Sequence, residues 1–147
     1  MQLTKFTDLG LRVMMRLAVS PGEGLTTSQV ADEMSIPYTH TTKVVLRLKE
    51  LGMIEARRGR GGGLSITESA RSTSVGWLTR KLEGGGEVVT CDGTAPCPLR
   101  HDCRLRGALR QAQDAFFDAL DAFTVDDLVR ESASPVLLSL STRPSEK

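Results

Sequence analysis

The sequence has 147 residues, of which 39% are hydrophobic and 25% charged, and its formal net charge is +1. These values are typical of a soluble globular protein with one compact domain, or a small domain with an appendage. No apolar run approaches the roughly 20 residues of a membrane-spanning helix. Charges at Asp8, Arg12 and Arg16 interrupt the apolar N-terminal stretch and argue against a signal peptide. We therefore expect a cytoplasmic protein with no membrane partner.

The first part of the chain predicts three helices. Apolar residues at helical spacing predict a first helix that Thr7 or Asp8 caps and that ends at Pro21. A short second helix, which Thr27 caps, is predicted over 28–34. A third helix is predicted over 38–52, with Val44, Val45, Leu48 and Leu51 buried.

Two short strand-like segments come next, at 53–56 and 64–66, on either side of a glycine-rich basic tip. This pattern predicts a β-hairpin. A helix, a short helix, a helix and a basic hairpin together make a winged helix-turn-helix. The predicted fold class is therefore mainly α, with a winged helix-turn-helix domain over 1–83 that includes one further helix after the hairpin.

The charge distribution and the third helix point to DNA. Residues 1–66 carry 9 Lys and Arg against 6 Asp and Glu, whereas residues 67–147 carry 10 against 12. Hydroxyl and basic groups, which contact phosphates and base edges, dominate the outer face of 38–52, where a merely solvated helix would mix Glu and Lys. The predicted DNA-binding residues are Ser28, Gln29, Tyr38, Thr39, His40, Thr41, Lys43, Arg47, Arg57, Arg58 and Arg60.

The second half contains a long amphipathic helix that begins after Cys103, and the region 104–130 is predicted to hold this helix and a final turn. Its apolar residues repeat at nearly heptad spacing over about three heptads. They could pack onto the chain's own DNA-binding domain, but a twofold dimer suits a DNA reader, and dimerisation is the preferred interpretation. The predicted seam residues are Leu105, Leu109, Ala112, Phe116, Leu120 and Phe123. Residues 131–147 are predicted to be a mobile tail.

All three cysteines lie in one Gly- and Pro-containing loop, 84–103, as Cys91, Cys97 and Cys103 with five residues between neighbours. Three such thiols could be inert, could bind zinc or could bind an iron–sulfur cluster. Structural zinc usually has four protein ligands and a CxxC knuckle, which this spacing does not provide. Wider thiolate spacing suits a cluster, so the loop favours iron and sulfide over zinc.

Several motifs together resemble one family. The segments LTKFTDLGLRVMMRLA, PYTHTTKVVLRL and RRGRGGGLSIT, with C-x5-C-x5-C before a long helix, are similar to the winged-helix iron–sulfur regulators that include IscR and NsrR, and above all to the nitric-oxide-sensing repressors among them. The resemblance covers roughly residues 1–130. It implies a homodimeric repressor on a DNA operator of twofold symmetry, with one cluster per subunit, [4Fe-4S], and nitric oxide as the signal.

A cluster on three cysteines needs a fourth ligand. The resemblance implies an aspartate at the start of the first helix, supplied by the other subunit, and Asp8 stands there. In IscR-like members a histidine serves, but Arg106 occupies that position and cannot ligate. The other candidates in the sequence are His40, His101, Glu87, Asp92 and Asp102. Asp8 could instead cap its helix or pair with the arginine four residues on.

Other functions remain open at this level. A regulator of iron–sulfur assembly or redox stress is the nearest alternative, and the arginine at position 106 argues against it. A zinc-stabilised interaction module is a second alternative. An enzyme or electron carrier is not expected, because the glycine-rich GRGGG segment lacks the strand-to-helix setting of a phosphate-binding loop.

Overall fold

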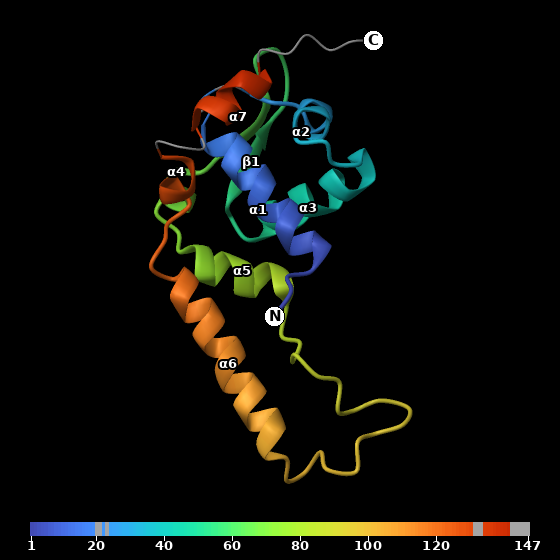
Figure 1. The fold of residues 1–147 in the computed structure, drawn as a ribbon. Helices are drawn as coiled ribbons and strands as arrows, with labels where there is room; N and C mark the ends of the chain where they lie inside the picture. Colours follow the sequence, from blue (N-terminus) through green and yellow to red (C-terminus); the bar gives the residue numbers. More distant parts are fainter. Residues whose placement is uncertain (20–21, 23, 131–133, 142–147) are drawn as a thin grey trace.

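The structure is a computed structural model that describes residues 1–19, 22, 24–130 and 134–141. The chain folds mainly into helices with one small antiparallel sheet, as the sequence predicted (Figure 1). Its elements are α1 (Lys5–Ala18), α2 (Thr27–Glu33), α3 (Tyr38–Glu50), β1 (Ile54–Arg57), β2 (Gly63–Ile66), α4 (Glu68–Arg71), α5 (Val75–Glu83), α6 (Arg104–Leu120), the short 3-10 helix η1 (Asp126–Val129) and α7 (Ser134–Ser141).

Two helix caps differ from the prediction. Helix α1 is capped by Thr4, whose hydroxyl accepts a hydrogen bond from the Thr7 N–H at 3.3 Å, and neither Thr7 nor Asp8 is the cap. Helix α2 is capped by Thr26 in a capping box, in which the Gln29 side chain accepts from the Thr26 N–H at 2.8 Å. Each helix thus begins at least one residue earlier than expected. The predicted end of α1 at Pro21 lies outside the described residues.

The core of the winged-helix body forms where α1, α2 and α3 meet. Val13, Met14 and Leu17 of α1 are almost completely buried, and so are Val44 and Leu48 of α3. These residues recur every three or four positions, so each helix presents one apolar stripe to the others. The helix-turn-helix pair therefore owes its geometry mainly to this shared apolar burial.

The hairpin pairs β1 and β2 in antiparallel register, with Ile54 opposite Ile66 and Arg57 opposite Gly63. Leu25 adds a one-residue bridge to Leu64, with N–H to O distances of 3.3 and 2.7 Å in the two directions. Leu64 lies opposite Ala56, one rung from the tip of the hairpin, so the bridge joins this end of β2 to the segment before α2. Strand β2 thus has hydrogen-bonded neighbours on both of its edges, β1 and Leu25.

Helix α5 crosses beneath the winged-helix body, and the cysteine loop follows it (Figure 1). Helix α6 begins at the end of this loop that is far from the body and runs back toward α5. The two helices approach closely because Gly76 has no side chain, and a Cβ there would overlap the Phe117 carbonyl and the Asp121 carboxylate. After α6 the chain returns to the body, where the Val75 N–H donates to the Phe123 carbonyl at 2.8 Å. Val125 and Val129 then join the core.

Residues 134–141 correct the predicted tail. They form helix α7, and Leu137 on this helix is buried in the main core. Apolar burial therefore organises a segment that the sequence analysis assigned to a mobile tail. The rest of that predicted tail, 131–133 and 142–147, lies outside the described residues. No helix in the described part of the chain has the length and hydropathy to cross a bilayer.

Candidate DNA-reading surface and cysteine loop

The first half of α3 presents a polar surface to solvent. Tyr38, Thr39, His40 and Lys43 are all exposed, as the sequence predicted for a groove-reading helix. Because α3 packs its Val44–Leu48 stripe against α1 and α2, these four side chains point outward from a rigid support. Their donors and acceptors are free to meet base edges or phosphates.

Thr41 does not belong to this surface. Its side chain is fully buried, and its hydroxyl donates to the Pro37 carbonyl at 3.2 Å. The prediction that Thr41 contacts DNA is wrong, because position 41 lies one turn before Val44 and Val45 and shares their core-facing stripe. Thr42 is exposed, but its hydroxyl is also occupied, donating to the Tyr38 carbonyl at 2.9 Å.

Arg47 turns toward the chain itself. Its guanidinium lies 3.2 Å from a Glu50 carboxylate oxygen and donates to the Lys81 carbonyl of α5 at 3.3 Å. Position 47 is more than two turns beyond Tyr38, at the end of α3 that faces α5. The structure thus gives Arg47 an intramolecular role that the sequence analysis did not foresee.

Ser28 and Gln29 lie at the start of α2, and both are exposed. Gln29 is engaged in the capping box through both its main chain and its side chain. Its amide oxygen therefore already accepts a hydrogen bond within the protein. The structure brings this helix start to solvent, as a phosphate contact would need.

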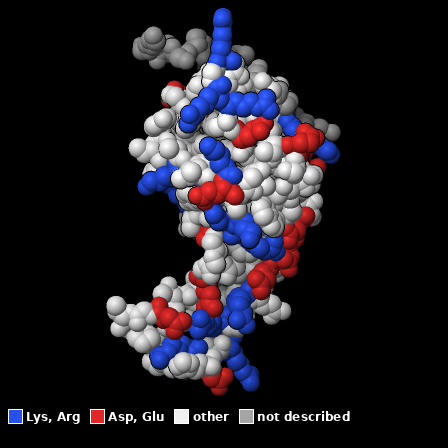
Figure 2. Space-filling view, turned by 180° about the vertical axis from the view of Figure 1, so that it is seen from behind, with Lys and Arg blue, Asp and Glu red and all other residues white. Residues whose placement is uncertain are grey.

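The wing carries three exposed arginines, Arg57, Arg58 and Arg60. Arg57 forms an ion pair with Glu55 at 3.1 Å, which is worth little because both side chains are largely in water. Gly59 and Gly61 have φ of 93° and 76°, so the tight tip between the arginines depends on glycine. In Figure 2, several Lys and Arg side chains lie over the upper part of this face with Asp and Glu between them, and acidic and basic side chains also mix over its lower part.

The loop 84–103 forms neither helix nor strand, and the structure describes all of its residues. Its three cysteines are free thiols and half-buried. The Cys97 N–H donates to the Cys91 carbonyl at 3.0 Å, and Cys103 caps α6 by accepting from the Arg106 N–H at 3.4 Å. Within the described residues no three His, Cys, Asp or Glu side chains converge to hold a metal ion. The donor chemistry still fits a cluster, since three unpaired thiols in one peripheral loop are the soft ligands that iron–sulfur clusters take.

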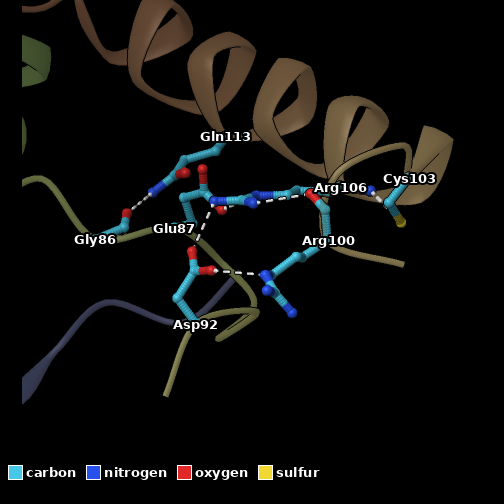
Figure 3. A network of polar contacts seen from close by, with 7 residues as sticks. All are labelled: Gly86, Glu87, Asp92, Arg100, Cys103, Arg106 and Gln113. Carbon is cyan, nitrogen blue, oxygen red and sulfur yellow. Dashed lines mark hydrogen bonds and ion pairs between the residues drawn. The ribbon is translucent and has the colours of Figure 1, made fainter. Parts of the chain in front are cut away.

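Polar contacts attach this loop to α6 (Figure 3). The Arg106 side chain reaches Glu87 at 2.6 Å, Asp92 at 3.4 Å and the Arg100 carbonyl at 3.3 Å. Nearly two turns further along α6, the Gln113 side chain donates to the Gly86 carbonyl at 2.9 Å. The hydrogen bond to Glu87 raises the pKa of Arg106 above its ordinary value, partial desolvation opposes the rise, and the charges of Glu87, Asp92 and Cys91 add to it.

Sequence reasoning treated Arg106 only as a residue that cannot ligate iron, and it missed Gln113. Both face the loop because they lie seven positions apart, nearly two turns of one helix face. A polar pair at heptad spacing inside an amphipathic helix was the available signal. It does not reveal the partners, which come from residues 86–100.

Asp8 lies in the first turns of α1 and pairs with Arg12 at 2.8 Å. Because Thr4 is the helix cap, the capping alternative for Asp8 is excluded, and the ion-pair alternative is present. The Asp8 side chain remains 45% exposed, so a second chain could reach it. Among the other ligand candidates, Glu87 and Asp92 are engaged with Arg106.

Helix α6 has two neighbouring faces. Phe117 is buried against α5, and the Arg80 guanidinium lies 5.3 Å from the centre of its ring. The predicted seam lies on the other face, where Leu105 is 65% exposed. Phe123, also predicted for the seam, lies three residues beyond the end of α6 and is 51% exposed. Of the remaining seam residues, Ala112 is exposed and Leu109, Phe116 and Leu120 are half-buried. The single chain thus leaves the seam partly uncovered, and Phe117 makes the packing on its own domain.

Two named transcriptional regulators are similar to this chain in sequence. Over 147 residues the chain is 59% identical to the HTH-type transcriptional repressor NsrR of Streptomyces coelicolor, covering 99% of each sequence. It is 39% identical over 132 residues to the HTH-type transcriptional regulator NsrR of Shouchella clausii, covering 88% of this chain and 89% of that one.

Solved structures share the fold. The T. potens IscR structure aligns with a TM-score of 0.69 at 20% identity, over 88% of this chain and 87% of that one. The oxidized form of Staphylococcus aureus CymR aligns with a TM-score of 0.68 at 25% identity, over 89% and 98% of the two chains. These likenesses confirm the winged-helix fold class.

The family match completes the assignment. The family described as Rrf2, iron-dependent transcriptional regulator, matches residues 3–131. That span contains the reading helix, the wing, the cysteine loop and α6. The curated relatives are named as transcriptional regulators, in agreement with the prediction that the chain is not an enzyme. The chain belongs to the Rrf2 family and is a winged-helix transcriptional regulator.

Proposed function

We propose that this regulator is a homodimeric repressor that releases its operator when nitric oxide destroys an iron–sulfur cluster held by the cysteine loop. The observation that carries the proposal is the pairing of three free thiols in one loop with an exposed reading helix in a chain 59% identical to a repressor named NsrR. Nitric oxide and cluster chemistry come from the resemblance to the nitric-oxide-sensing members.

DNA binding rests on α3 and the wing. Tyr38, Thr39, His40 and Lys43 enter a major groove, since one helix fits that groove and these side chains project from its exposed first half. The wing arginines lie beside it, where they contact phosphates without reading bases. Ser28 and Gln29, at the start of α2, add phosphate contacts of the same kind.

Dimerisation rests on the exposed seam of α6. Leu105, Leu109 and Phe116 project from one stripe of a 17-residue helix, and a second copy of the same stripe covers them around a twofold axis. Such a dimer places two copies of α3 side by side. The operator is then expected to be twofold symmetric, with half-sites spaced by the distance between the two reading helices.

The cluster ligands are Cys91, Cys97 and Cys103, with Asp8 of the partner subunit as the fourth. One [4Fe-4S] cluster per subunit is proposed. When bound, the cluster would supply iron as the target of nitric oxide. Asp8 would be its most weakly held ligand, because a carboxylate is a hard donor. Arg12, 2.8 Å from Asp8 in this structure, offers that carboxylate an ion-pair partner within its own helix.

The contact between α1 and α3 carries this change to the DNA. Phe6 and Leu9 of α1 and His40 and Lys43 of α3 line one hollow of about 260 Å³. A shift at the start of α1 therefore acts directly on two of the groove-reading side chains. While Asp8 is a ligand, α1 of one subunit is tied to the loop of the other, and the two reading helices keep their spacing.

Anaerobic purification tests the proposal. We expect iron and acid-labile sulfide in a ratio near one, about four of each per chain as a [4Fe-4S] cluster requires, and tight operator binding that nitric oxide abolishes. Cys97→Ser is expected to lack iron and sulfide while staying helical and dimeric. Stoichiometric zinc, or full operator affinity in the cluster-free protein, would contradict the proposal.

A further inference from the structure

The cysteine loop has no secondary structure of its own, yet two side chains of α6 hold it. Arg106 contacts Glu87 and Asp92 upstream of Cys97 and the Arg100 carbonyl downstream of it (Figure 3). Gln113 fixes the Gly86 carbonyl, where the loop leaves α5. The Arg106 guanidinium therefore binds both limbs of the loop, the limb before Cys97 and the limb after it.

The geometry suits arginine in particular. A guanidinium is planar and presents several donors in a fixed fork, so it can bind separate acceptors at once. Here its Nε and one terminal nitrogen serve the upstream carboxylates, and the other terminal nitrogen serves the downstream carbonyl. A lysine ammonium is a point charge and cannot span the same acceptors with the same directions.

Charge adds a second reason. Glu87 and Asp92 place two carboxylates in the limb before Cys97. Arg106 pairs with both, at 2.6 Å and 3.4 Å, and Arg100 approaches Asp92 at 3.9 Å. The Arg106 side chain is 30% exposed, so water screens these interactions only in part.

We propose that Arg106 positions the cysteine loop for cluster binding, by holding the limb before Cys97 and the limb after it against the first turn of α6. This inference rests on the proposed function, because it assumes that the three cysteines are ligands. Arg106 acts through the loop and is a positioning residue, not a ligand. It also explains how the position that bears a ligating histidine in IscR-like members can serve a different task in this chain.

The clamp consists of side-chain and main-chain groups of this chain. Arg106 and Gln113 hold the loop, and Cys103 is fixed as the cap of α6. Such fixed positions for the cysteines lower the entropy that cluster binding must overcome. Without Arg106, the two limbs keep the ion pair of Arg100 with Asp92 at 3.9 Å and the hydrogen bond from the Cys97 N–H to the Cys91 carbonyl, but they lose their shared attachment to α6.

Hydrogen exchange in the cluster-free protein tests the clamp directly. The reporters are three loop amides with main-chain acceptors, those of Cys97, Arg100 and Asp102. Arg106→Ala removes hydrogen bonds to both limbs of the loop, so it is expected to speed the exchange of these amides about tenfold. The matched control is Arg110→Ala, which removes the same charge one turn later from an exposed side chain without a hydrogen bond or ion pair to the described residues.

Arg106→Lys separates charge from geometry. Lysine is expected to keep the pairing with Glu87 but not the bond to the Arg100 carbonyl, so the Arg100 and Asp102 amides should exchange as fast as in Arg106→Ala. Reconstitution then gives a second readout, in which Arg106→Ala should lose its visible absorbance under chelator about tenfold faster than wild type or Arg110→Ala. Thermal unfolding of the helical signal shows that each variant is folded.

The outcomes separate the two proposals. Equal exchange in wild type, Arg106→Ala and Arg110→Ala would overturn the clamp. Faster exchange in Arg106→Ala with an unchanged cluster lifetime would overturn its role in cluster binding. Absence of iron and sulfide from the wild-type protein would refute the proposed function itself, whatever the exchange rates are.

Discussion

The guanidinium of Arg47 on α3 donates to the main-chain carbonyl of Lys81 on α5 at 3.3 Å. The reading helix is thus tied to the last turn of the helix from which the cysteine loop departs. On the other side of the same turn, the Thr4 N–H donates to the Glu83 carboxylate at 2.5 Å. The end of α5 therefore touches both α1 and α3 just before Gly84.

The Arg47 contact predicts that Arg47 contributes to stability, whereas Lys43 on the same helix contributes to DNA sequence preference. Arg47→Ala is expected to lower the free energy of unfolding by about 1 kcal/mol, the usual worth of one such hydrogen bond, and to leave sequence preference unchanged. Lys43→Ala is expected to relax preference at one operator position by about 1–3 kcal/mol, with stability intact. Urea unfolding and binding to operators with single base changes measure both. Equal loss of sequence preference in the two variants would return Arg47 to the DNA-reading set.

The wing predicts a different effect on DNA binding. Arg58 and Arg60 are exposed at the tip and should contact phosphates, so changing both to alanine should weaken binding to all sequences alike. The slope of log affinity against log salt should become shallower by about two. Titrations at several salt concentrations, with operator and random DNA, check this. A selective loss on the operator would show that the wing reads bases.

Asp8 predicts opposite results for two substitutions. Asp8→Ala should keep the dimer, because the α6 seam needs no metal, but its operator affinity should fall toward that of the cluster-free protein. Asp8→Cys should bind a cluster that reacts more slowly with nitric oxide, because a thiolate is a softer ligand than a carboxylate. Operator affinity and the nitrosylation rate measure both effects. Wild-type values in both variants would leave Asp8 with its Arg12 ion pair and favour His101 as the ligand.

The buried ion pair between Arg16 and Glu33 predicts a large loss of stability. The Arg16 side chain is fully buried and joins α1 to α2 through Glu33, which is 17% exposed. Removing one partner of a buried pair takes away part of the compensation of a buried charge, so Glu33→Gln should cost up to about 3 kcal/mol in urea unfolding. Glu50→Gln is the control, since its pair with Arg47 is half in water and should cost less than about 1 kcal/mol. Similar losses in both would show that burial of Arg16 is not decisive.

The junction of α5 and α6 predicts sensitivity to acid. A hydrogen bond from the Ser74 hydroxyl, followed by one from Arg80, lowers the pKa of Asp121 below its ordinary value. A carboxyl with a lowered folded pKa stabilises the fold above its unfolded pKa, about 3.9, and loses that contribution as pH falls through the folded value. Asp121→Asn should therefore be less stable than wild type at pH 7 and lose less stability between pH 5 and 2 (about three pH units). Parallel curves of unfolding temperature against pH would exclude this role.

Much of this protein follows from local pattern. The spacing of apolar residues, mainly Val, Leu and Met in α1 and α3 and Leu, Ala and Phe in α6, predicted these helices, because an apolar stripe every three or four residues is typical of an amphipathic helix. The glycines around Arg58 and Arg60 predicted the wing, since tight tips need positive φ. Three thiols in one segment predicted a cluster site, which stays a prediction. Each of these signals acts within a few residues of chain.

The tertiary structure decided between alternatives that the local sequence pattern cannot distinguish. Thr4 and Thr7 are both able to cap α1, and only the packing that buries Thr7 selects Thr4. Thr41 lies on an apparently polar helix, but the docking of α1 and α2 turns it inward. Helix α7 is stabilised by the burial of Leu137 in the core. Arg106 became a loop anchor only when folding placed Glu87, Asp92 and the Arg100 carbonyl around it, since a hydrogen bond between distant residues has no periodicity that a sequence could show.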